Sequence, residues 1–421
     1  MDEILINGGT RLRGEVRVSG AKNSALPILA STILGSGECV ITNVPRVVDV
    51  LTMGKLLGIL GVKVSHEGNR AVVQTGKIDS TEAPYDLVKT MRASVLVLGP
   101  LLARWGEAKV SLPGGCAIGS RPVNLHLAGL AKLGAEISLD HGYITAKATK
   151  LKGGRIYSDT PTVTGTENLM MAASLAEGTT VLENSAKEPE IVDLADFLVK
   201  RGARIHGAGT DVITIEGVRE LHGGDHEVIP DRIEAGTYLA AAAITRGDVT
   251  ATHCRPSHLE AVLMKLREAG AEIREEKDSV RLTMPNKLRG TDVRTLPFPG
   301  FPTDMQAQMA AVMSLAEGTS VVTETVFESR FMHVEELRRM GADIRVEGNR
   351  LVVTGCKKLT GAPVMASDLR ASAGLIVAGL AAEGTTQIQR VYHLDRGYER
   401  IEEKLRALGA HVRRRPAGVI H

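Results

Sequence analysis

The sequence predicts an α/β protein built from six copies of one unit of roughly 70 residues. Two independent sequence patterns, each a short phrase that recurs along the chain, support this prediction. The first ends an apolar helical stretch, and its central glycines are Gly61, Gly134, Gly202, Gly270, Gly341 and Gly409. The second places a glycine and a polar residue before β-forming residues, and its glycines are Gly37, Gly106, Gly178, Gly247, Gly318 and Gly384. The repeat is the main structural signal because both markers share one period over the whole chain.

Each unit is predicted to follow a βαβαββ order. A first helix, such as residues 23–34 or 305–316, ends near the Gly-polar phrase, and a strand such as residues 319–323 follows it. A second, amphipathic helix comes next, as in residues 190–200 or 257–268, and the Gly-Ala phrase ends it. Two alternating strands joined by a turn, such as residues 136–139 and 143–146, and a third short strand complete the unit.

The repeats also predict the domains. The last unit stops near residue 413 without its closing strands, and residues 3–7 and 15–19 match the missing strands in pattern. We therefore expect one domain over residues 21–229 and a second over residues 1–20 plus 230–421, each with three repeats. The chain would cross twice between them, which predicts a hinge and a ligand cleft.

Composition excludes several functional classes. The 421 residues have a net charge of +2 and only 3% aromatic residues, which gives no sign of nucleic-acid or membrane binding. The start, Met1-Asp2-Glu3, does not resemble a signal peptide. The four cysteines lie far apart, so we expect no metal site and no disulfide framework, and we expect a cytoplasmic protein with reduced thiols.

Cations occur where helices begin. The first helices are predicted to start near Lys22, Arg92, Glu167, Glu234, Asp304 and Arg370. Acidic residues are expected there as caps, whereas a cation at a helix N-terminus indicates an anion between the two. Three more arginines, Arg121, Arg330 and Arg396, lie in loops before second helices. The two sets predict a small polyanionic ligand, whereas Arg413-Arg414-Arg415 is expected to be a solvated edge.

The loop at residues 113–122 combines glycines and prolines with Cys116 and Arg121. An exposed thiol beside an arginine has a lowered pKa and is reactive, but Cys116 could equally be a small apolar filler of a turn. His126, near the start of the following apolar helix, could tune Cys116 or serve packing. These residues alone leave both alternatives open.

Several motifs together resemble one enzyme family. They are Gly20-Ala21-Lys22-Asn23-Ser24-Ala25, Met91-Arg92-Ala93-Ser94, the loop through Arg121 with Pro122-Val123-Asn124-Leu125-His126, Thr162-Val163-Thr164-Gly165-Thr166-Glu167-Asn168, Phe301-Pro302-Thr303-Asp304-Met305-Gln306 and Ser367-Asp368-Leu369-Arg370. Over its full length the chain resembles the UDP-N-acetylglucosamine 1-carboxyvinyltransferases, enolpyruvyl transferases of peptidoglycan synthesis within the EPSP synthase superfamily. The resemblance implies an inside-out α/β barrel of two three-unit domains.

The resemblance also implies an activity and its residues. The family transfers the enolpyruvyl group of phosphoenolpyruvate to the 3′-hydroxyl of UDP-N-acetylglucosamine through a tetrahedral ketal, with no cofactor or metal. Cys116 matches the general acid and can form a covalent adduct, Asp304 matches the base on the sugar hydroxyl, and Asp368 matches an acid of the elimination stage. The implied phosphoenolpyruvate ligands are Lys22, Asn23, Arg121, Arg330, Arg370 and Arg396, of which Lys22 and Arg396 also count as catalytic. The implied UDP-sugar contacts are Asn23, Arg92, Arg121, Pro122, Val123, Asn124, Leu125, Val163, Thr164, Gly165, Asp304 and Val326.

Two positions depart from the pattern. Some members have lysine where Pro161 stands, and some have aspartate where Asn124 stands, so contacts with the sugar nucleotide differ there. The loop cysteine predicts sensitivity to fosfomycin. Two alternatives are an enzyme acting on shikimate 3-phosphate, like 5-enolpyruvylshikimate-3-phosphate synthase, and a non-catalytic paralogue that binds UDP-sugar.

Overall fold

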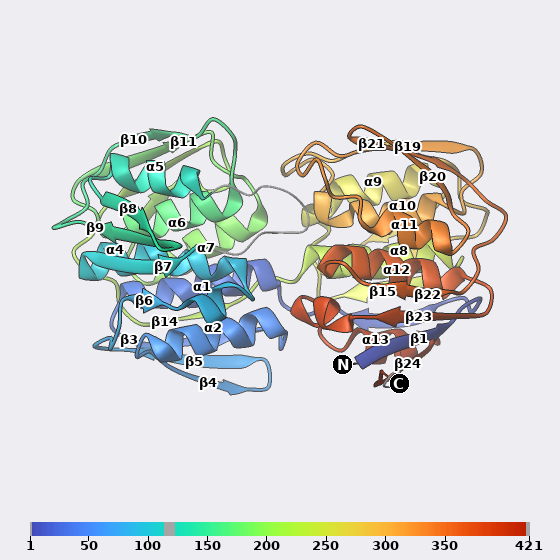
Figure 1. Cartoon of the computed structure of the whole chain (residues 1–421), viewed down its shortest axis with the longest axis horizontal. Coiled ribbons are helices and arrows are strands. Elements are labelled where there is room, and N and C mark those ends of the chain that lie inside the picture. Colours follow the sequence, from blue (N-terminus) through green and yellow to red (C-terminus); the bar gives the residue numbers. More distant parts are fainter. Residues whose placement is uncertain (1, 113–122, 418–421) are drawn as a thin grey trace. The chain divides into compact units, whose positions relative to one another are not determined.

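A computed structural model describes residues 2–112 and 123–417. These residues form two compact units. Unit 1 contains residues 2–19 and 230–417, and unit 2 contains residues 20–112 and 123–229. The described strands form six four-stranded sheets, three in each unit (Figure 1).

Every sheet follows one pattern, in which a short strand pairs in parallel with a second strand and two antiparallel strands follow. In unit 2 the strands, in sheet order, are β14 (Gly224–Glu227), β3 (Gly37–Thr42), β5 (Arg70–Thr75) and β4 (Lys63–Glu67); β6 (Glu82–Ala83), β7 (Glu107–Ser111), β9 (Tyr143–Lys147) and β8 (Glu136–Asp140); and β10 (Arg155–Tyr157), β11 (Thr179–Glu183), β13 (Val212–Glu216) and β12 (Arg204–His206). The strands alternate buried and exposed residues, as period-two sequence patterns require.

In unit 1 the chain's first strands complete two of the sheets. These sheets are β2 (Arg13–Arg17), β15 (Asp248–Thr252), β17 (Ser279–Thr283) and β16 (Glu272–Glu275); β18 (Val293–Arg294), β19 (Thr319–Thr323), β21 (Arg350–Thr354) and β20 (Asp343–Glu347); and β22 (Pro363–Met365), β23 (Thr385–Gln389), β1 (Asp2–Asn7) and β24 (His411–Pro416). Ile4 of β1 pairs with Ile388 on one side and Arg414 on the other. Strand β2 pairs in parallel with β15.

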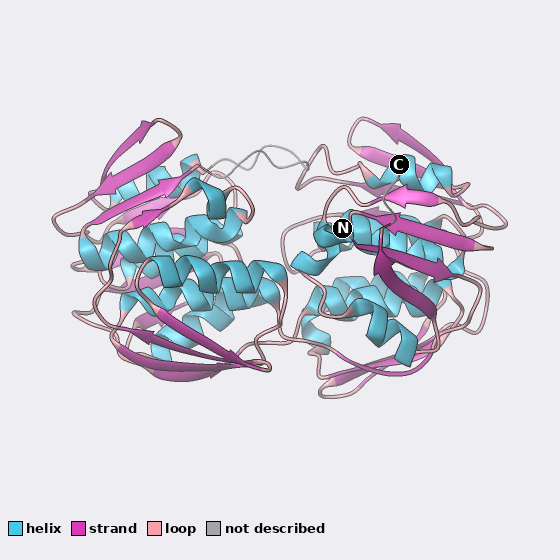
Figure 2. Ribbon diagram, turned by 60° about the horizontal axis from the view of Figure 1, so that its bottom comes forward, coloured by secondary structure: helices cyan, strands magenta, loops and turns pink. Residues whose placement is uncertain are grey.

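Helices fill the interior of each unit and strands lie outside them (Figure 2). The inner helices are α1 (Lys22–Ser31), α4 (Leu98–Trp105) and α6 (Val163–Ala173) in unit 2, and α8 (Arg232–Ile244), α10 (Gln306–Met313) and α12 (Leu369–Ala381) in unit 1. In α8, α10 and α12 the residues are nearly all buried, because small and apolar side chains occur on every side of these helices. This arrangement is the inside-out α/β fold that the resemblance implied.

The second helices cover each unit's inner helices. They are α2 (Val48–Ile59), α5 (Asn124–Lys132) and α7 (Pro189–Lys200) in unit 2, and α9 (Glu260–Glu268), α11 (His333–Arg339) and α13 (Ile401–Ala407) in unit 1. Shorter helical segments are α3 (Tyr85–Val88), η1 (Thr32–Leu34), η2 (Arg92–Val97), η3 (Pro256–His258), η4 (Thr303–Met305) and η5 (Val391–Arg396). The Gly-Ala phrase follows each second helix, and its glycines adopt positive φ, as at Gly61 (φ 95°) and Gly341 (φ 92°). A left-handed residue at this position ends a helix, which explains why the repeat is visible as glycine.

Some predicted helix boundaries were wrong. The first helix of the third unit, α6, begins at Val163. Glu167 therefore lies inside α6 and does not cap it, and the Thr162 hydroxyl accepts the Gly165 N–H instead. The predicted helix at residues 257–268 divides into η3 and α9.

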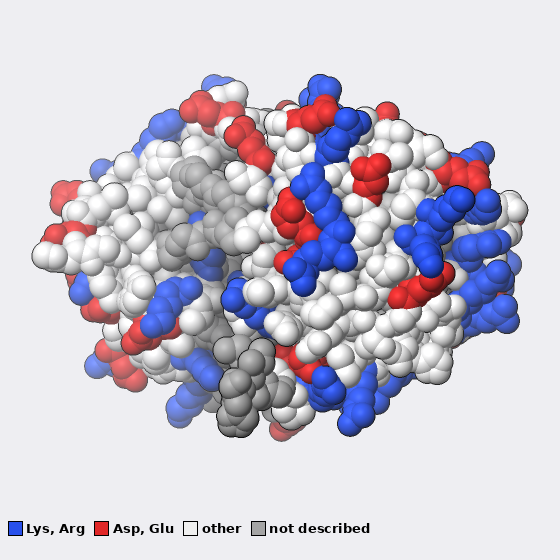
Figure 3. Space-filling model, turned by 45° about the vertical axis from the view of Figure 1, so that its right-hand side comes forward, with Lys and Arg blue, Asp and Glu red and all other residues white. Residues whose placement is uncertain are grey.

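In the part of the chain that the structure describes, no helix is both long and apolar enough to cross a bilayer. Acidic and basic side chains are interspersed on the face in Figure 3.

Close packing of the inner helices generates a prediction. A Cβ at Gly374 of α12 would lie 2.9 Å from the carbonyl carbon of Ala307, so Gly374→Ala is expected to destabilise the protein by about 1–3 kcal/mol. The matched control is Gly58→Ala in α2, where no atom lies within 4 Å of the new Cβ, and helix propensity predicts equal or higher stability. Thermal unfolding of both variants checks this, and an unchanged midpoint for Gly374→Ala contradicts it.

Candidate functional site

Two arginines hold the Asp304 carboxylate in unit 1. Asp304 lies in η4, Arg330 lies in the loop before α11, and Arg370 lies in the first turn of α12. Oδ1 of Asp304 accepts a hydrogen bond from Nη1 of Arg330 at 2.8 Å. Oδ2 accepts from Nε and Nη2 of Arg370 at 3.0 and 2.9 Å. Asp304 therefore does not cap its helix, as the sequence suggested, but bridges two cations.

The bridged charges differ in exposure. The side chains of Arg330 and Arg370 are 7% and 4% exposed, whereas that of Asp304 is 23% exposed. Burial lowers the pKa of the Arg370 guanidinium, but the Asp304 carboxylate raises it, and the net pKa lies above its ordinary value. The guanidinium of Arg370 also interacts with the Tyr398 hydroxyl, but no acceptor among the described residues lies within hydrogen-bond distance of its buried Nη1. Arg370 therefore stays cationic and retains a donor for a further anion.

A buried carboxylate that the sequence analysis missed organises the neighbouring loop. Glu324 is fully buried directly after β19. Its Oε1 accepts the N–H groups of Val326 and Phe327 at 2.8 and 3.0 Å. Its Oε2 accepts the Thr303 hydroxyl at 2.8 Å, and the Thr303 oxygen in turn accepts a hydrogen bond from Arg330 at 3.0 Å. Glu324 therefore positions both the predicted contact Val326 and the arginine that binds Asp304.

The other two predicted catalytic residues of unit 1 lie at helical segments. Asp368 is the N-cap of α12, and its Oδ1 accepts the N–H groups of Arg370 and Ala371 at 2.8 and 3.1 Å. Arg396 is half-buried at the end of η5. The preceding residue, Asp395, forms an ion pair with Arg414 of β24. The expectation of a solvated edge was therefore wrong for Arg414, which also lies 3.6 Å from Glu402.

Lys22 and Asn23 begin α1 in unit 2. Nζ of Lys22 lies 3.2 Å from Oδ2 of Asp49, and both side chains are buried. Asp49 lies in the first turn of α2, and nothing in its local sequence distinguishes it from an ordinary helix-start carboxylate. The partner of Lys22 is thus supplied by the next helix of the same repeat. Asn23, which follows Lys22 in the chain, is half-buried.

His126 joins two other predicted segments of unit 2. Its Nδ1 lies 3.1 Å from Nδ2 of Asn168, and its Nε2 lies 3.4 Å from Oγ1 of Thr164. Burial and then the nearby charge of Arg92 lower the pKa of His126 to about 4. His126 is therefore a neutral, hydrogen-bonded side chain at ordinary pH, so its role is not limited to packing.

The remaining predicted contacts in unit 2 differ in exposure. Arg92, Val123, Leu125, Val163 and Thr164 are half-buried, Gly165 is buried and Asn124 is exposed. Pro161, the first departure from the family pattern, is half-buried before α6. Cys116, Arg121 and Pro122, which were also predicted as site residues, lie outside the described residues.

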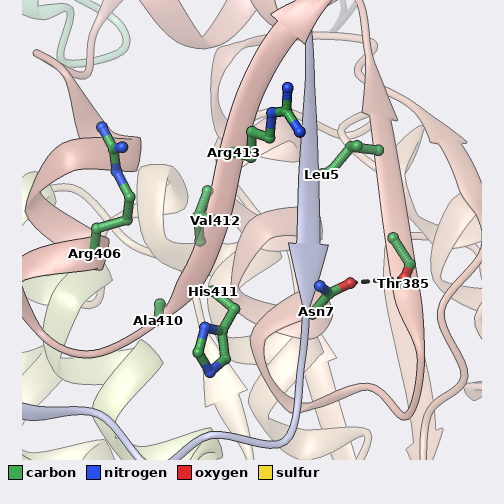
Figure 4. Close-up of a pocket in the computed structure, with 8 residues that line it drawn as sticks. All are labelled: Leu5, Asn7, Thr385, Arg406, Ala410, His411, Val412 and Arg413. Carbon is green, nitrogen blue, oxygen red and sulfur yellow. Dashed lines mark hydrogen bonds between the residues drawn. The ribbon is translucent and has the colours of Figure 1, made fainter.

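One concave surface of the described residues contains none of the predicted site residues. A depression of about 450 Å³ in unit 1 lies at β1, β23, α13 and β24 (Figure 4). Its lining residues are Leu5, Asn7, Thr385, Arg406, Ala410, His411, Val412 and Arg413. Within residues 2–112 and 123–417, no group of three or more His, Cys, Asp or Glu side chains is arranged to hold a metal ion.

Comparison with known proteins gives a consistent result. The model of the EPSP synthase (3-phosphoshikimate 1-carboxyvinyltransferase) family matches residues 6–405. The chain is 58% identical over 415 residues to a UDP-N-acetylglucosamine 1-carboxyvinyltransferase of Thermodesulfovibrio yellowstonii, covering 98% of this chain and 100% of that protein. It is 61% identical to the protein of the same name from Nitratidesulfovibrio vulgaris, covering 98% and 99%.

Solved structures agree on the fold. The chain resembles the enolpyruvyl transferase NikO of Streptomyces tendae with a TM-score of 0.88 and 27% identity, covering 99% of both chains. It resembles EPSP synthase of Acinetobacter baumannii with a TM-score of 0.76 and 17% identity, covering 99% of this chain and 100% of that one. The second likeness is one of fold alone.

The hydrogen bonds of Glu324 generate a prediction. Glu324→Gln removes the charge of the acceptor and so weakens the charge-assisted hydrogen bonds from the Val326 and Phe327 N–H groups; we therefore expect faster amide hydrogen exchange at these two residues. A loss of ~1–3 kcal/mol of local stability corresponds to an increase in the exchange rate of about 5- to 150-fold. The matched control is Glu328→Gln, because that side chain is exposed in the same loop. Equal exchange in both variants contradicts the assigned role of Glu324.

Proposed function

The chain belongs to the UDP-N-acetylglucosamine 1-carboxyvinyltransferases of the EPSP synthase family, and we propose that it transfers the enolpyruvyl group of phosphoenolpyruvate to the 3′-hydroxyl of UDP-N-acetylglucosamine. The observation that carries this proposal is the high identity to relatives of that name along nearly the whole chain. The reaction supplies a precursor of peptidoglycan.

The reaction has two stages. In the first, the sugar 3′-oxygen bonds to C2 of phosphoenolpyruvate, C3 receives a proton from Cys116, and the hydroxyl proton passes to Asp304. In the second, the bond between C2 and the phosphate oxygen breaks and C3 loses a proton, with assistance from Asp368. The products are the enolpyruvyl ether of the sugar nucleotide and inorganic phosphate.

The remaining charged residues bind the substrates. Lys22, Arg121 and Arg396 hold the phosphate, and Arg330 and Arg370 hold the carboxylate of phosphoenolpyruvate. The sugar nucleotide contacts Asn23, Arg92, the segments 121–125 and 163–165, Asp304 and Val326. No cofactor is invoked.

The two arginines that bind Asp304 support a sequence of events in which Asp304 acts as a base only after phosphoenolpyruvate has bound. Both oxygens of Asp304 accept hydrogen bonds from Arg330 and Arg370, so three of the roughly four acceptor sites of the carboxylate are occupied before substrate binds. A substrate carboxylate that takes these arginines competes directly with Asp304 and displaces it. Phosphoenolpyruvate binding thereby frees Asp304 to accept the sugar hydroxyl proton.

Phosphate release tests the overall activity. The protein is expected to release phosphate from phosphoenolpyruvate with UDP-N-acetylglucosamine, and fosfomycin is expected to block it. Cys116→Ser should lower kcat by about 10²–10⁴-fold, because a hydroxyl is a weaker acid than a thiol. Cys356→Ser is the control, since the described contacts of that thiol are with the Ser314 and Lys358 carbonyls. Phosphate release only with shikimate 3-phosphate would indicate a 5-enolpyruvylshikimate-3-phosphate synthase activity. No phosphate release with either substrate would indicate a non-catalytic paralogue.

Steady-state kinetics test the competition at Asp304. Asp304→Asn keeps the size of the side chain but removes its charge and basicity, so kcat is expected to fall by about 10²–10⁴-fold. The KM for phosphoenolpyruvate should stay level or decrease, because the charged competitor for Arg330 and Arg370 is gone. A clear increase in that KM would show that Asp304 helps the arginines to bind substrate and does not compete for them.

A further inference from the structure

The orientation of one buried amide fixes the proton position on His126. Oδ1 of Asn168 accepts the Gly99 N–H at 2.7 Å, and that backbone group can only donate. Nδ2 of Asn168 donates to the Val95 carbonyl at 2.9 Å. These two bonds exclude the flipped amide, which would place donor against donor and acceptor against acceptor.

The second hydrogen of the Asn168 amide points to His126. Nδ1 of His126 lies 3.1 Å from Nδ2 of Asn168, so Nδ1 has to accept. A neutral imidazole that accepts at Nδ1 carries its proton on Nε2. Nε2 lies 3.4 Å from Oγ1 of Thr164 and therefore donates to that oxygen.

The direction of this bond determines what Thr164 can do. Its oxygen accepts from His126, so its own hydroxyl proton is directed to another acceptor. Thr164 is half-buried in the first turn of α6, within the segment expected to contact the sugar nucleotide. An acceptor oxygen of the ligand at this helix start would receive that proton together with the backbone N–H groups.

We propose that Asn168 and His126 are positioning residues, which orient the Thr164 hydroxyl as a hydrogen-bond donor to UDP-N-acetylglucosamine. The role in substrate binding rests on the proposed function, whereas the proton position does not. Asn168 and His126 are both buried, so water cannot readily replace either contact. The charged group that acts on His126 is Arg92, which opposes imidazolium formation, as burial does.

The proton position can be measured without substrate. Long-range proton–nitrogen NMR correlation on the intact protein, with the His126 signals assigned by their loss in His126→Gln, is expected to show an unprotonated Nδ1 and a protonated Nε2. This pattern should persist from pH 8 to about pH 5, since the pKa lies near 4. A protonated Nδ1 in this range overturns the proposal whatever the enzyme's substrate is.

An isosteric variant tests the consequence for binding. Asn168→Asp keeps the acceptor for Gly99 but places a carboxylate oxygen at Nδ1 of His126. That oxygen can only accept, so Nδ1 becomes protonated and the pKa of His126 rises. At high pH, neutral His126 then accepts at Nε2, and the Thr164 hydroxyl donates to the imidazole and not to the ligand. At low pH, the imidazolium again donates to Thr164.

The variant is therefore expected to gain a pH dependence with a defined sign. The KM for UDP-N-acetylglucosamine should increase by about tenfold as the pH rises through the new pKa of His126, with kcat and the KM for phosphoenolpyruvate little changed. The wild type and the control Asn286→Asp, whose side chain is exposed in unit 1, should lack this step. The absence of the step in a folded Asn168→Asp protein overturns the proposal.

A second variant covers the possibility that Asn168→Asp does not fold. Thr164→Val removes the hydroxyl at nearly constant volume, so the KM for UDP-N-acetylglucosamine should increase by about tenfold at every pH, without a step. An unchanged KM means that the Thr164 hydroxyl does not bind the ligand and overturns the proposal. Circular dichroism confirms folding of each variant.

Discussion

The ion pairs of Asp304 with Arg330 and Arg370 are the interaction on which the proposed chemistry of unit 1 depends. Two nearly buried guanidinium groups face one partly exposed carboxylate, and removing one partner from such a set leaves an uncompensated buried charge. In the proposed reaction, the carboxylate of phosphoenolpyruvate replaces Asp304 without that penalty, because it brings an equal negative charge to the arginines. The ion pairs with Asp304 hold Arg330 and Arg370 in place. In the proposed reaction they are the contacts that a substrate carboxylate has to replace.

Buried polar side chains then fix the groups that surround these charges. Glu324 receives the hydroxyls of Thr295 and Thr303 and two backbone N–H groups, so its four hydrogen bonds offset the cost of burying a carboxylate. Asn168 serves unit 2 in the same way, because it binds the backbone of η2 and α4 as well as His126. In both units a residue that was not predicted as a site residue sets the geometry of residues that were.

The fold was predictable from the sequence because its signals are local. A left-handed glycine after each second helix and alternation along each strand are properties of short segments, so the repeat predicted strands such as β19 at residues 319–323. The N-terminal strands could be matched to the missing closing strands for the same reason. Helix starts were less predictable: Thr162 is a favoured N-cap by residue type, whereas the acidic side chain of Glu167 suggested a later start, and Glu167 is in fact buried inside α6.

The partners of the site residues were not predictable, because they come from other segments of the chain. Asp49 is 27 residues from Lys22, and Arg370 is 66 residues from Asp304. Family resemblance names the residues that contact substrate, but it does not give the direction of a hydrogen bond. That direction follows from donors and acceptors that cannot change role: the Gly99 N–H and the Val95 carbonyl orient Asn168, Asn168 orients His126, and His126 orients Thr164. A backbone fixed by helix packing can thereby determine which way a hydroxyl proton points at the start of α6.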